Sequence, residues 1–183
     1  MPTEVMRVLF VCTGNICRSP VAQRILERYA ADRDIGVYVS SAGTRAMNGA
    51  PMHPESVRVL AERGIVAGEF KSRLLTPAIA SDFDLILGMT REHRAAARQL
   101  SPARWRRMYA LREIVTGTPG AADGAFSTSS PVDPTDGRLD IEDPIGRPSE
   151  IFDRVAADID EATSQLGAWI ETQLARTITS KRS

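Results

Sequence analysis

Short apolar runs alternate along the chain with segments in which apolar residues recur at helical spacing. Four runs stand out: MRVLFVC at 6–12, VYVSSAG at 37–43, DLILGM at 84–89, and a shorter one within RRMYALREI at 106–114. They are rich in β-branched and aromatic residues. Short uninterrupted runs of this kind are typical of strands that are buried on both faces of a sheet. We therefore predict four buried strands.

The segments between these runs have the spacing and the end signals of helices. Thr76, Thr90 and Ser149 suit N-cap positions, and Gly64 suits a helix stop. The predicted helices run from Pro20 to about Ala31, from Pro54 to Arg63, from Pro77 over a short stretch, from Thr90 to about Leu100, and from Ser149 to about Leu174. Alternating strands and helices predict an α/β fold, in which a parallel sheet has helices on both faces.

No second domain is evident, so we expect one domain over residues 1–183. A Gly-, Ser-, Pro- and Asp-rich stretch at 117–140 predicts a long loop insertion, and residues 177–183 predict a frayed tail.

Charge and composition exclude several classes of partner. Lys+Arg and Asp+Glu both total 23, so no whole-chain field draws the protein to nucleic acid or to an anionic membrane. No secretory signal and no membrane span is evident. Two cysteines make no disulfide scaffold, and His53 and His93 are isolated, as a helix-start and a surface residue would be. We expect a cytoplasmic protein that needs no metal or other cofactor.

The segment CTGNICRS at 12–19 carries the candidate chemistry. Cys12 ends the first strand, and ligands of parallel sheets bind beyond such carboxyl ends. The segment leads into a helix, so backbone N–H groups and the positive end of the helix dipole converge on one point. Gly14 permits a tight curve, Asn15 tolerates a left-handed conformation, and Arg18 can grip two oxygens of a phosphate. These features predict a cradle for a tetrahedral dianion.

A thiol at the base of this cradle would be a nucleophile. The field that binds a dianion also favours the thiolate form of Cys12, and the Ser19 hydroxyl can donate a hydrogen bond to it. A buried cysteine is often only a small apolar residue. The strand before Cys12 and the helix after it favour catalysis instead.

The segment VLFVCTGNICRSPVA at 8–22 resembles the signature of the low-molecular-weight protein tyrosine phosphatase family, and SAGT at 41–44, FDLILGM at 83–89 and IEDP at 141–144 resemble its later blocks in order. The resemblance covers residues 6 to about 175. It implies a doubly wound, four-stranded parallel sheet. Cys12 would be the nucleophile, Arg18 the phosphate clamp and Ser19 the thiolate stabiliser, while Asn15 and Ser41 hold the loop in shape. The phosphate-binding residues would be Thr13, Gly14, Asn15, Ile16, Cys17, Arg18 and Ser19.

Hydrolysis also calls for a proton donor to the leaving group. The segment DIEDPIGRP offers Asp140, Glu142 and Asp143, and Asp133 precedes another proline. We favour Asp143, since Pro144 stiffens its loop and the last helix begins soon after, as in the family.

The residues around the cradle leave the substrate open. Tyrosine-specific members of the family usually carry aromatic residues where this chain has Met47 and Ile145, and Phe70 stands where many have histidine. Three segments are closer to the bacterial protein arginine phosphatase branch: 89–93, 111–117 and 143–146. That branch, however, tends to carry threonine at the position of Ile16. We expect a phosphotyrosine protein substrate, with phosphoarginine as the alternative.

Two further alternatives share the cradle. An arsenate reductase needs cysteines after Cys17, and the chain has none. A non-catalytic phosphate-binding module would need neither the thiol of Cys12 nor the carboxyl of Asp143. The resemblance also points to a reversible disulfide between Cys12 and Cys17.

Overall fold

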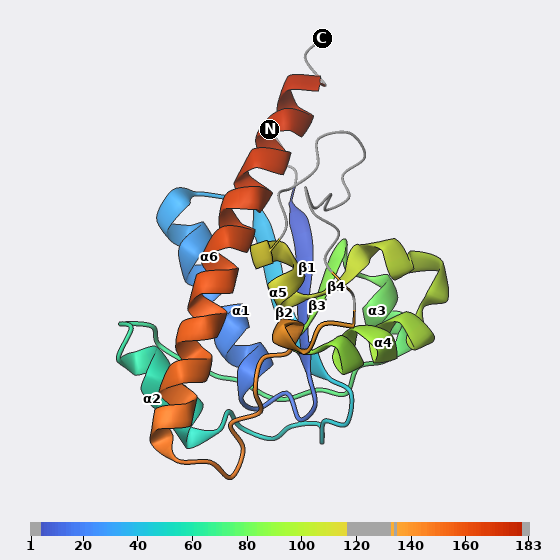
Figure 1. Cartoon of the computed structure of the whole chain (residues 1–183). Helices are drawn as coiled ribbons and strands as arrows, with labels where there is room; N and C mark the ends of the chain where they lie inside the picture. Colours follow the sequence, from blue (N-terminus) through green and yellow to red (C-terminus); the bar gives the residue numbers. More distant parts are fainter. Residues whose placement is uncertain (1–4, 117–132, 134, 181–183) are drawn as a thin grey trace.

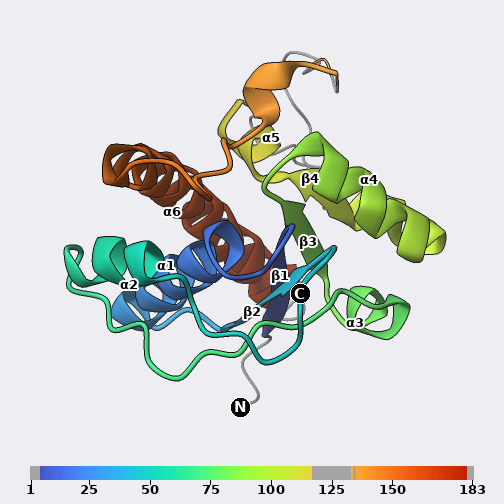
Figure 2. The ribbon, with the colours of Figure 1, turned by 90° about the horizontal axis from the view of Figure 1, so that it is seen from below.

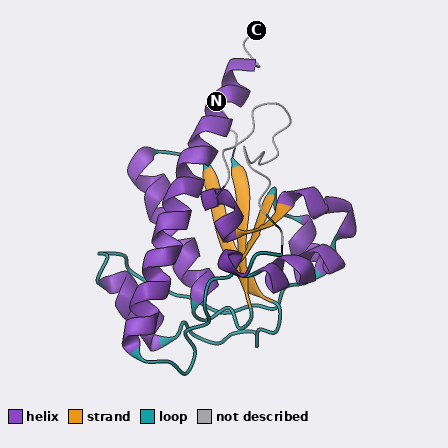
Figure 3. Cartoon of the chain, in the orientation of Figure 1, coloured by secondary structure: helices purple, strands orange, loops and turns teal. Residues whose placement is uncertain are grey.

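The computed structural model describes residues 5–116, 133 and 135–180. Four strands form one parallel sheet, which confirms the predicted architecture (Figure 3). The strands are β1 (Met6–Cys12), β2 (Val37–Gly43), β3 (Leu85–Gly88) and β4 (Met108–Ala110), in the order β2-β1-β3-β4. Cys12 therefore ends a central strand, where a loop can receive groups from both neighbouring strands.

The helices follow the predicted pattern closely. They are α1 (Arg18–Arg33), α2 (Pro54–Ala61), α3 (Pro77–Ser81), α4 (Arg91–Leu100), α5 (Leu111–Thr116) and α6 (Ser149–Ser180), with 3-10 helices η1 (Pro102–Arg107) and η2 (Gly137–Leu139). Thr76 and Thr90 cap α3 and α4 as expected, since each hydroxyl accepts a backbone N–H of its first turn. Helix α5 was not predicted. It begins at Leu111, which is fully buried, and the side chain of Glu113 accepts the Ala110 N–H just before it.

The C-terminal prediction was wrong for residues 177–180. Helix α6 continues to Ser180 and extends past the rest of the fold (Figure 1). Thr177 suits a helical position, because its hydroxyl donates to the Gln173 carbonyl one turn earlier. Residues 181–183 lie outside the described residues, as do 117–132 and 134 of the predicted loop insertion.

Helices cover both faces of the sheet (Figure 2). Helices α1, α2 and α6 lie on one side, and α3 and α4 lie on the other. Val8, Phe10 and Cys12 of β1 belong to the core on the α1 and α6 side, while Leu9 and Val11 belong to the core on the opposite side. This alternation explains why β1 has an uninterrupted apolar sequence. It also directs the Cys12 side chain toward the N-terminus of α1.

Candidate active site

The loop between β1 and α1 turns through one left-handed residue. Asn15 has a φ of 54°, whereas Gly14 is not among the residues with positive φ. A Cβ atom at Gly14 would lie 3.6 Å from Ile16 Cγ1, which is an ordinary contact. The expectation that Gly14 provides the curvature was therefore wrong. Asn15 makes the turn, and asparagine tolerates that conformation better than most residues do.

The Cys12 sulfur receives two polar contacts within the cradle. The Asn15 backbone N–H donates to Cys12 Sγ at 3.2 Å, and Ser19 Oγ lies 3.0 Å from the same sulfur. Asn15 Nδ2 donates to Ser19 Oγ at 2.9 Å, so the Ser19 hydroxyl hydrogen is free to point at Sγ. Both contacts can thus present hydrogens to the sulfur.

The fully buried side chain of Asn15 holds the loop in its left-handed turn. Its Nδ2 also donates to Ser41 Oγ at 2.9 Å, and its Oδ1 accepts the Arg73 backbone N–H at 2.9 Å. Ser41 in turn donates to Gln23 Oε1 at 2.7 Å. The structure thus brings Asn15 and Ser41 together beside the loop, and their roles in holding it stay predictions. Arg73 and Gln23 were missed, because no spacing in the sequence connects them to the cradle.

Gly43 at the end of β2 is a second residue that sequence analysis missed as part of the site. It pairs with Cys12 in the sheet, and the next residue, Thr44, donates its N–H to the Cys12 carbonyl at 2.9 Å. A Cβ atom at Gly43 would lie 2.9 Å from Asn15 N, and closer still to the Thr13 carbonyl oxygen. The strand can approach the cradle this closely only because residue 43 has no side chain.

Arg18 lies under the cradle and connects it to the loop that carries Asp143. Its side chain is 4% exposed; Nη1 donates to the Ile141 carbonyl at 2.9 Å, and Nη2 pairs with Asp143 Oδ2 at 2.9 Å. Arg18 Nε is buried and has no acceptor among the described residues. Asp143 is 49% exposed, and its Oδ1 accepts the Ile145 N–H at 3.2 Å. The arrangement leaves a half-exposed carboxyl that lines the same pocket as the buried Cys12.

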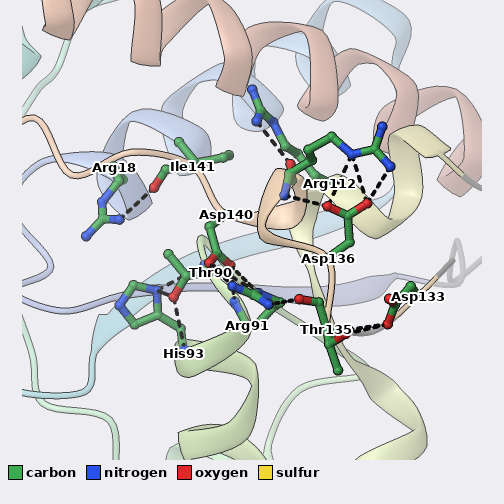
Figure 4. Close-up of polar contacts among 11 residues, drawn as sticks. Arg18, Thr90, Arg91, His93, Arg112, Asp133, Thr135, Asp136, Asp140 and Ile141 are labelled. Atoms are coloured by element: carbon green, nitrogen blue, oxygen red, sulfur yellow. Dashed lines mark hydrogen bonds and ion pairs between the residues drawn. The ribbon is translucent and has the colours of Figure 1, made fainter.

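The competing carboxylates are engaged elsewhere, and Figure 4 shows this for Asp133 and Asp140. Among the described residues, Asp143 is the carboxylate that pairs with Arg18. The other three candidates bind their own partners: Asp140 binds Arg91, Glu142 binds Arg154, and Asp133 binds Thr135. Of the four candidates, the structure thus brings Asp143 to Arg18, and its role as the acid stays a prediction.

A pocket of about 200 Å³ opens above the sulfur. Its lining residues are Cys12, Thr13, Gly14, Ile16, Cys17, Arg18, Asp143 and Ile145. Ile16 and Ile145 are thus brought together, as expected of walls. Met47 is not among the lining residues and is 81% exposed, so its part in substrate choice stays a prediction.

His93 contacts the cradle, contrary to the expectation that it is an isolated surface residue. It is 3% exposed, and its Nε2 lies 2.9 Å from Thr13 Oγ1. Nδ1 accepts the Thr90 backbone N–H at 3.2 Å, so Nε2 carries the hydrogen of the neutral ring and donates it to Thr13. Burial, followed by the charge of Arg18, lowers the pKa of His93 to about 4. His53 does start a helix, because Nδ1 accepts the Glu55 N–H.

Cys17 lies at the N-cap of α1 and is a free thiol, as is Cys12. It is 4% exposed, and burial raises its pKa to about 12. The disulfide between the two cysteines stays a prediction. Within the described residues, no group of three or more His, Cys, Asp or Glu side chains is arranged to hold a metal ion. Nor does that part of the chain contain a helix long and apolar enough to cross a bilayer.

Known proteins resemble this chain over most of its length. Residues 7–123 match the profile of the low molecular weight phosphotyrosine protein phosphatases. This chain belongs to that family. A protein-arginine-phosphatase from Geobacillus stearothermophilus is 31% identical over 91% of this chain and 97% of its own. Low molecular weight protein-tyrosine phosphatase A of Mycobacterium tuberculosis is also 31% identical, over 95% and 97%.

Solved structures extend the family likeness to the fold and the chemistry. An arginine phosphatase was solved as a cysteine-to-serine variant with a phosphorylated active-site serine. It aligns with a TM-score of 0.75 and 28% identity over 91% of this chain and 96% of its own. As a low molecular weight phosphatase, this chain is a hydrolase with cysteine-based chemistry and a phosphoenzyme intermediate.

Proposed function

We propose that this phosphatase hydrolyses phosphotyrosine in proteins, with Cys12 as nucleophile and Asp143 as general acid and base. One observation carries the proposal: the Cys12 sulfur, with two hydrogen-bond donors aimed at it, faces a pocket that Arg18 and Asp143 also line. Binding alone would need neither the thiol nor the carboxyl. A phosphorylated protein is the expected partner.

The residues divide the reaction into two steps. The Cys12 thiolate attacks phosphorus, the bond from phosphorus to the phenolic oxygen breaks, and Asp143 gives its proton to that oxygen. Water then attacks phosphocysteine and passes a proton to Asp143, while the electron pair of the S–P bond returns to sulfur and phosphate leaves. Arg18 and the backbone N–H groups of the cradle stabilise the charge on the phosphoryl oxygens in both steps.

The walls of the pocket support an aryl substrate. Ile16 and Ile145 line it, and Ile145 is 48% exposed, so both present apolar surface to a group that follows the phosphate. A phenyl ring buries apolar area against such side chains, whereas a charged guanidinium loses hydration against them and gains no acceptor from Ile16 or Ile145. Phosphotyrosine is therefore the leading substrate.

Phosphoarginine is the second candidate, and two observations favour it. Relatives matched over more than nine-tenths of their length include protein-arginine-phosphatases. None of the described residues that line the pocket is aromatic, so the ring stacking expected for phosphotyrosine is missing. Side-by-side rates on phosphotyrosine and phosphoarginine peptides of the same sequence decide between the two. We expect faster release of phosphate from phosphotyrosine, and the reverse order would assign the chain to arginine.

Variants test the mechanism with the same assay. Cys12→Ser should abolish turnover and keep the fold, because a hydroxyl is a far poorer nucleophile than a thiolate. Asp143→Asn should lower kcat/KM, which reports phosphoryl transfer to Cys12 alone, by roughly 10²–10⁴-fold on phosphotyrosine, while kcat/KM on an aryl phosphate with a low-pKa leaving group should fall much less. Asp133→Asn is the matched control and should be silent. Equal losses on both substrates in Asp143→Asn would assign that residue a structural role.

The remaining assignments belong to the same proposal. The chain acts as one domain over residues 1–183. It works in the cytoplasm, where Cys12 stays reduced.

A further inference from the structure

The loop that carries Asp143 is anchored three residues earlier, at Asp140. Asp140 Oδ1 accepts the backbone N–H of Arg91 at 2.7 Å, and Oδ2 pairs with Arg91 Nη2 at 2.8 Å. Arg91 Nε adds contacts to both oxygens at 3.1 and 3.2 Å (Figure 4). One carboxylate thus binds both the main chain and the side chain of a single residue.

The position of Arg91 makes this anchor strong. Arg91 is the first residue of α4, so the carboxylate lies at the positive end of a ten-residue helix. Partial burial raises the pKa of Asp140, but hydrogen bonds and charge from Arg91 outweigh burial and leave that pKa below its ordinary value. Asp140 is therefore an ionised anchor and not a proton donor.

The next residue transfers this rigidity to the active site. The Ile141 N–H donates to the Met89 carbonyl at 2.9 Å, and the Ile141 carbonyl accepts Arg18 Nη1 at 2.9 Å. Ile141 is 1% exposed, whereas Asp143, two residues on, is half exposed. The loop segment just before Asp143 is thus attached to α4, to the end of β3 and to Arg18.

The first turn of α4 also contacts the other half of the site. His93 on this turn donates to Thr13 beside the nucleophile. The helix can reach this position because Gly88 has no side chain, since a Cβ atom there would lie 2.7 Å from Arg94 N. One helical turn therefore touches both the acid loop and the cradle.

We infer that Asp140 is a positioning residue that, through the first turn of α4, sets the place of Asp143 relative to the Cys12 sulfur. The inference rests on the proposed role of Asp143 as general acid. Losing the anchor should lower the rate of phosphoryl transfer to Cys12 only when departure of the leaving group needs a proton. A residue that merely stabilised the fold would affect all substrates alike.

The kinetic test compares Asp140→Asn with a matched control. Asp136→Asn removes a carboxylate that also accepts a backbone N–H and pairs with an arginine, both from Arg138 within η2. The quantity to compare is kcat/KM, because it reports transfer of the phosphoryl group to Cys12 and not the later hydrolysis of phosphocysteine, in which Asp143 acts as a base on every substrate. Asp140→Asn should lower kcat/KM roughly tenfold on an aryl phosphate with a high-pKa leaving group, since misplacement of a catalytic group by a fraction of an ångström costs about that much. It should change kcat/KM less than about twofold on one with a low-pKa leaving group. Asp136→Asn should change neither.

The Asp143→Asn background supplies the second arm. Asp140→Asn should cause no further loss there, because there is no acid left to misplace. An equal loss on both substrates, or an undiminished loss in the Asp143→Asn background, would overturn the inference. Arg91→Gln, which keeps the backbone N–H, should shift the kinetics in the same direction by a smaller factor.

A measurement independent of turnover separates this inference from the proposed function. Amide exchange of Ile141 should accelerate at least tenfold in Asp140→Asn and stay unchanged in Asp136→Asn, in proteins that melt at comparable temperatures. If the amide exchange rate of Ile141 is unchanged in Asp140→Asn, Asp140 does not hold the loop, whatever the kinetic results are. If the wild-type protein hydrolyses neither aryl phosphate, the proposed function fails, while the exchange data still decide whether Asp140 holds the loop.

Discussion

Replacing Gly43 with alanine should disable the cradle although residue 43 lies outside it. The added Cβ atom would lie 2.9 Å from Asn15 N and 2.8 Å from Ala46 Cβ, whereas ordinary contacts begin at 3.4 Å. The loop must therefore move by at least about 0.5 Å at Asn15, and by more at the Thr13 carbonyl. The Asn15 N–H donates to Cys12 Sγ at 3.2 Å, so this movement lengthens and misaligns that hydrogen bond.

The expected loss follows from that displacement. A shift of about 1 Å in a catalytic group costs on the order of 10²-fold, so kcat should fall roughly 10- to 100-fold. Overpacking should also reduce the free energy of unfolding by about 1–3 kcal/mol. Steady-state rates on an aryl phosphate and urea unfolding of the same preparations measure the two effects.

Gly64→Ala is the control for stability alone. Gly64 has a φ of 69° and open space around its Cβ position at the end of α2, so alanine there strains the backbone without touching the cradle. It should lower stability by about 1 kcal/mol and leave kcat unchanged. If Gly43→Ala retains more than half of kcat, or if Gly64→Ala loses as much as Gly43→Ala, the steric argument is refuted.

Three further predictions concern specificity, pH and oxidation. Ile16→Thr should raise the ratio of phosphoarginine to phosphotyrosine turnover, because it removes apolar bulk that disfavours a guanidinium. An unchanged ratio would show that other residues determine the substrate preference. The pKa of His93 is lowered to about 4 in the folded protein, so the folded state resists protonation of this side chain. The free energy of unfolding should therefore be highest above about pH 6.5 and should fall by up to about 3 kcal/mol as the pH drops toward 4. Urea unfolding of His93→Gln should lack this pH dependence. Peroxide should inactivate the enzyme reversibly through a Cys12–Cys17 disulfide, whereas Cys17→Ser should lose activity that dithiothreitol cannot restore; full recovery of that variant would exclude the protective role.

The sequence alone was enough to predict the features that depend on residues close together in the chain: the strands, the helix caps and the cradle segment. A short, continuous apolar run is typical of a strand whose two faces are both buried, so β1 and the parallel sheet were predictable. The N-caps at Thr76 and Thr90 were predictable because a cap acts within one helical turn. The cradle from Cys12 to Ser19 is a single continuous segment, so its residues and their chemistry were visible together.

Only the tertiary structure decided which distant residues complete the site. Four carboxylates were predicted candidates for the acid; the structure brings Asp143 to Arg18, whereas the other three bind partners elsewhere. His93 is buried against Thr13, eighty residues away, and Gly43 is required by the parallel register that sets it beside Cys12. These roles depend on contacts between segments that lie far apart in the sequence. Sequence periodicity reports only on residues within one helix or strand, so it could not predict them.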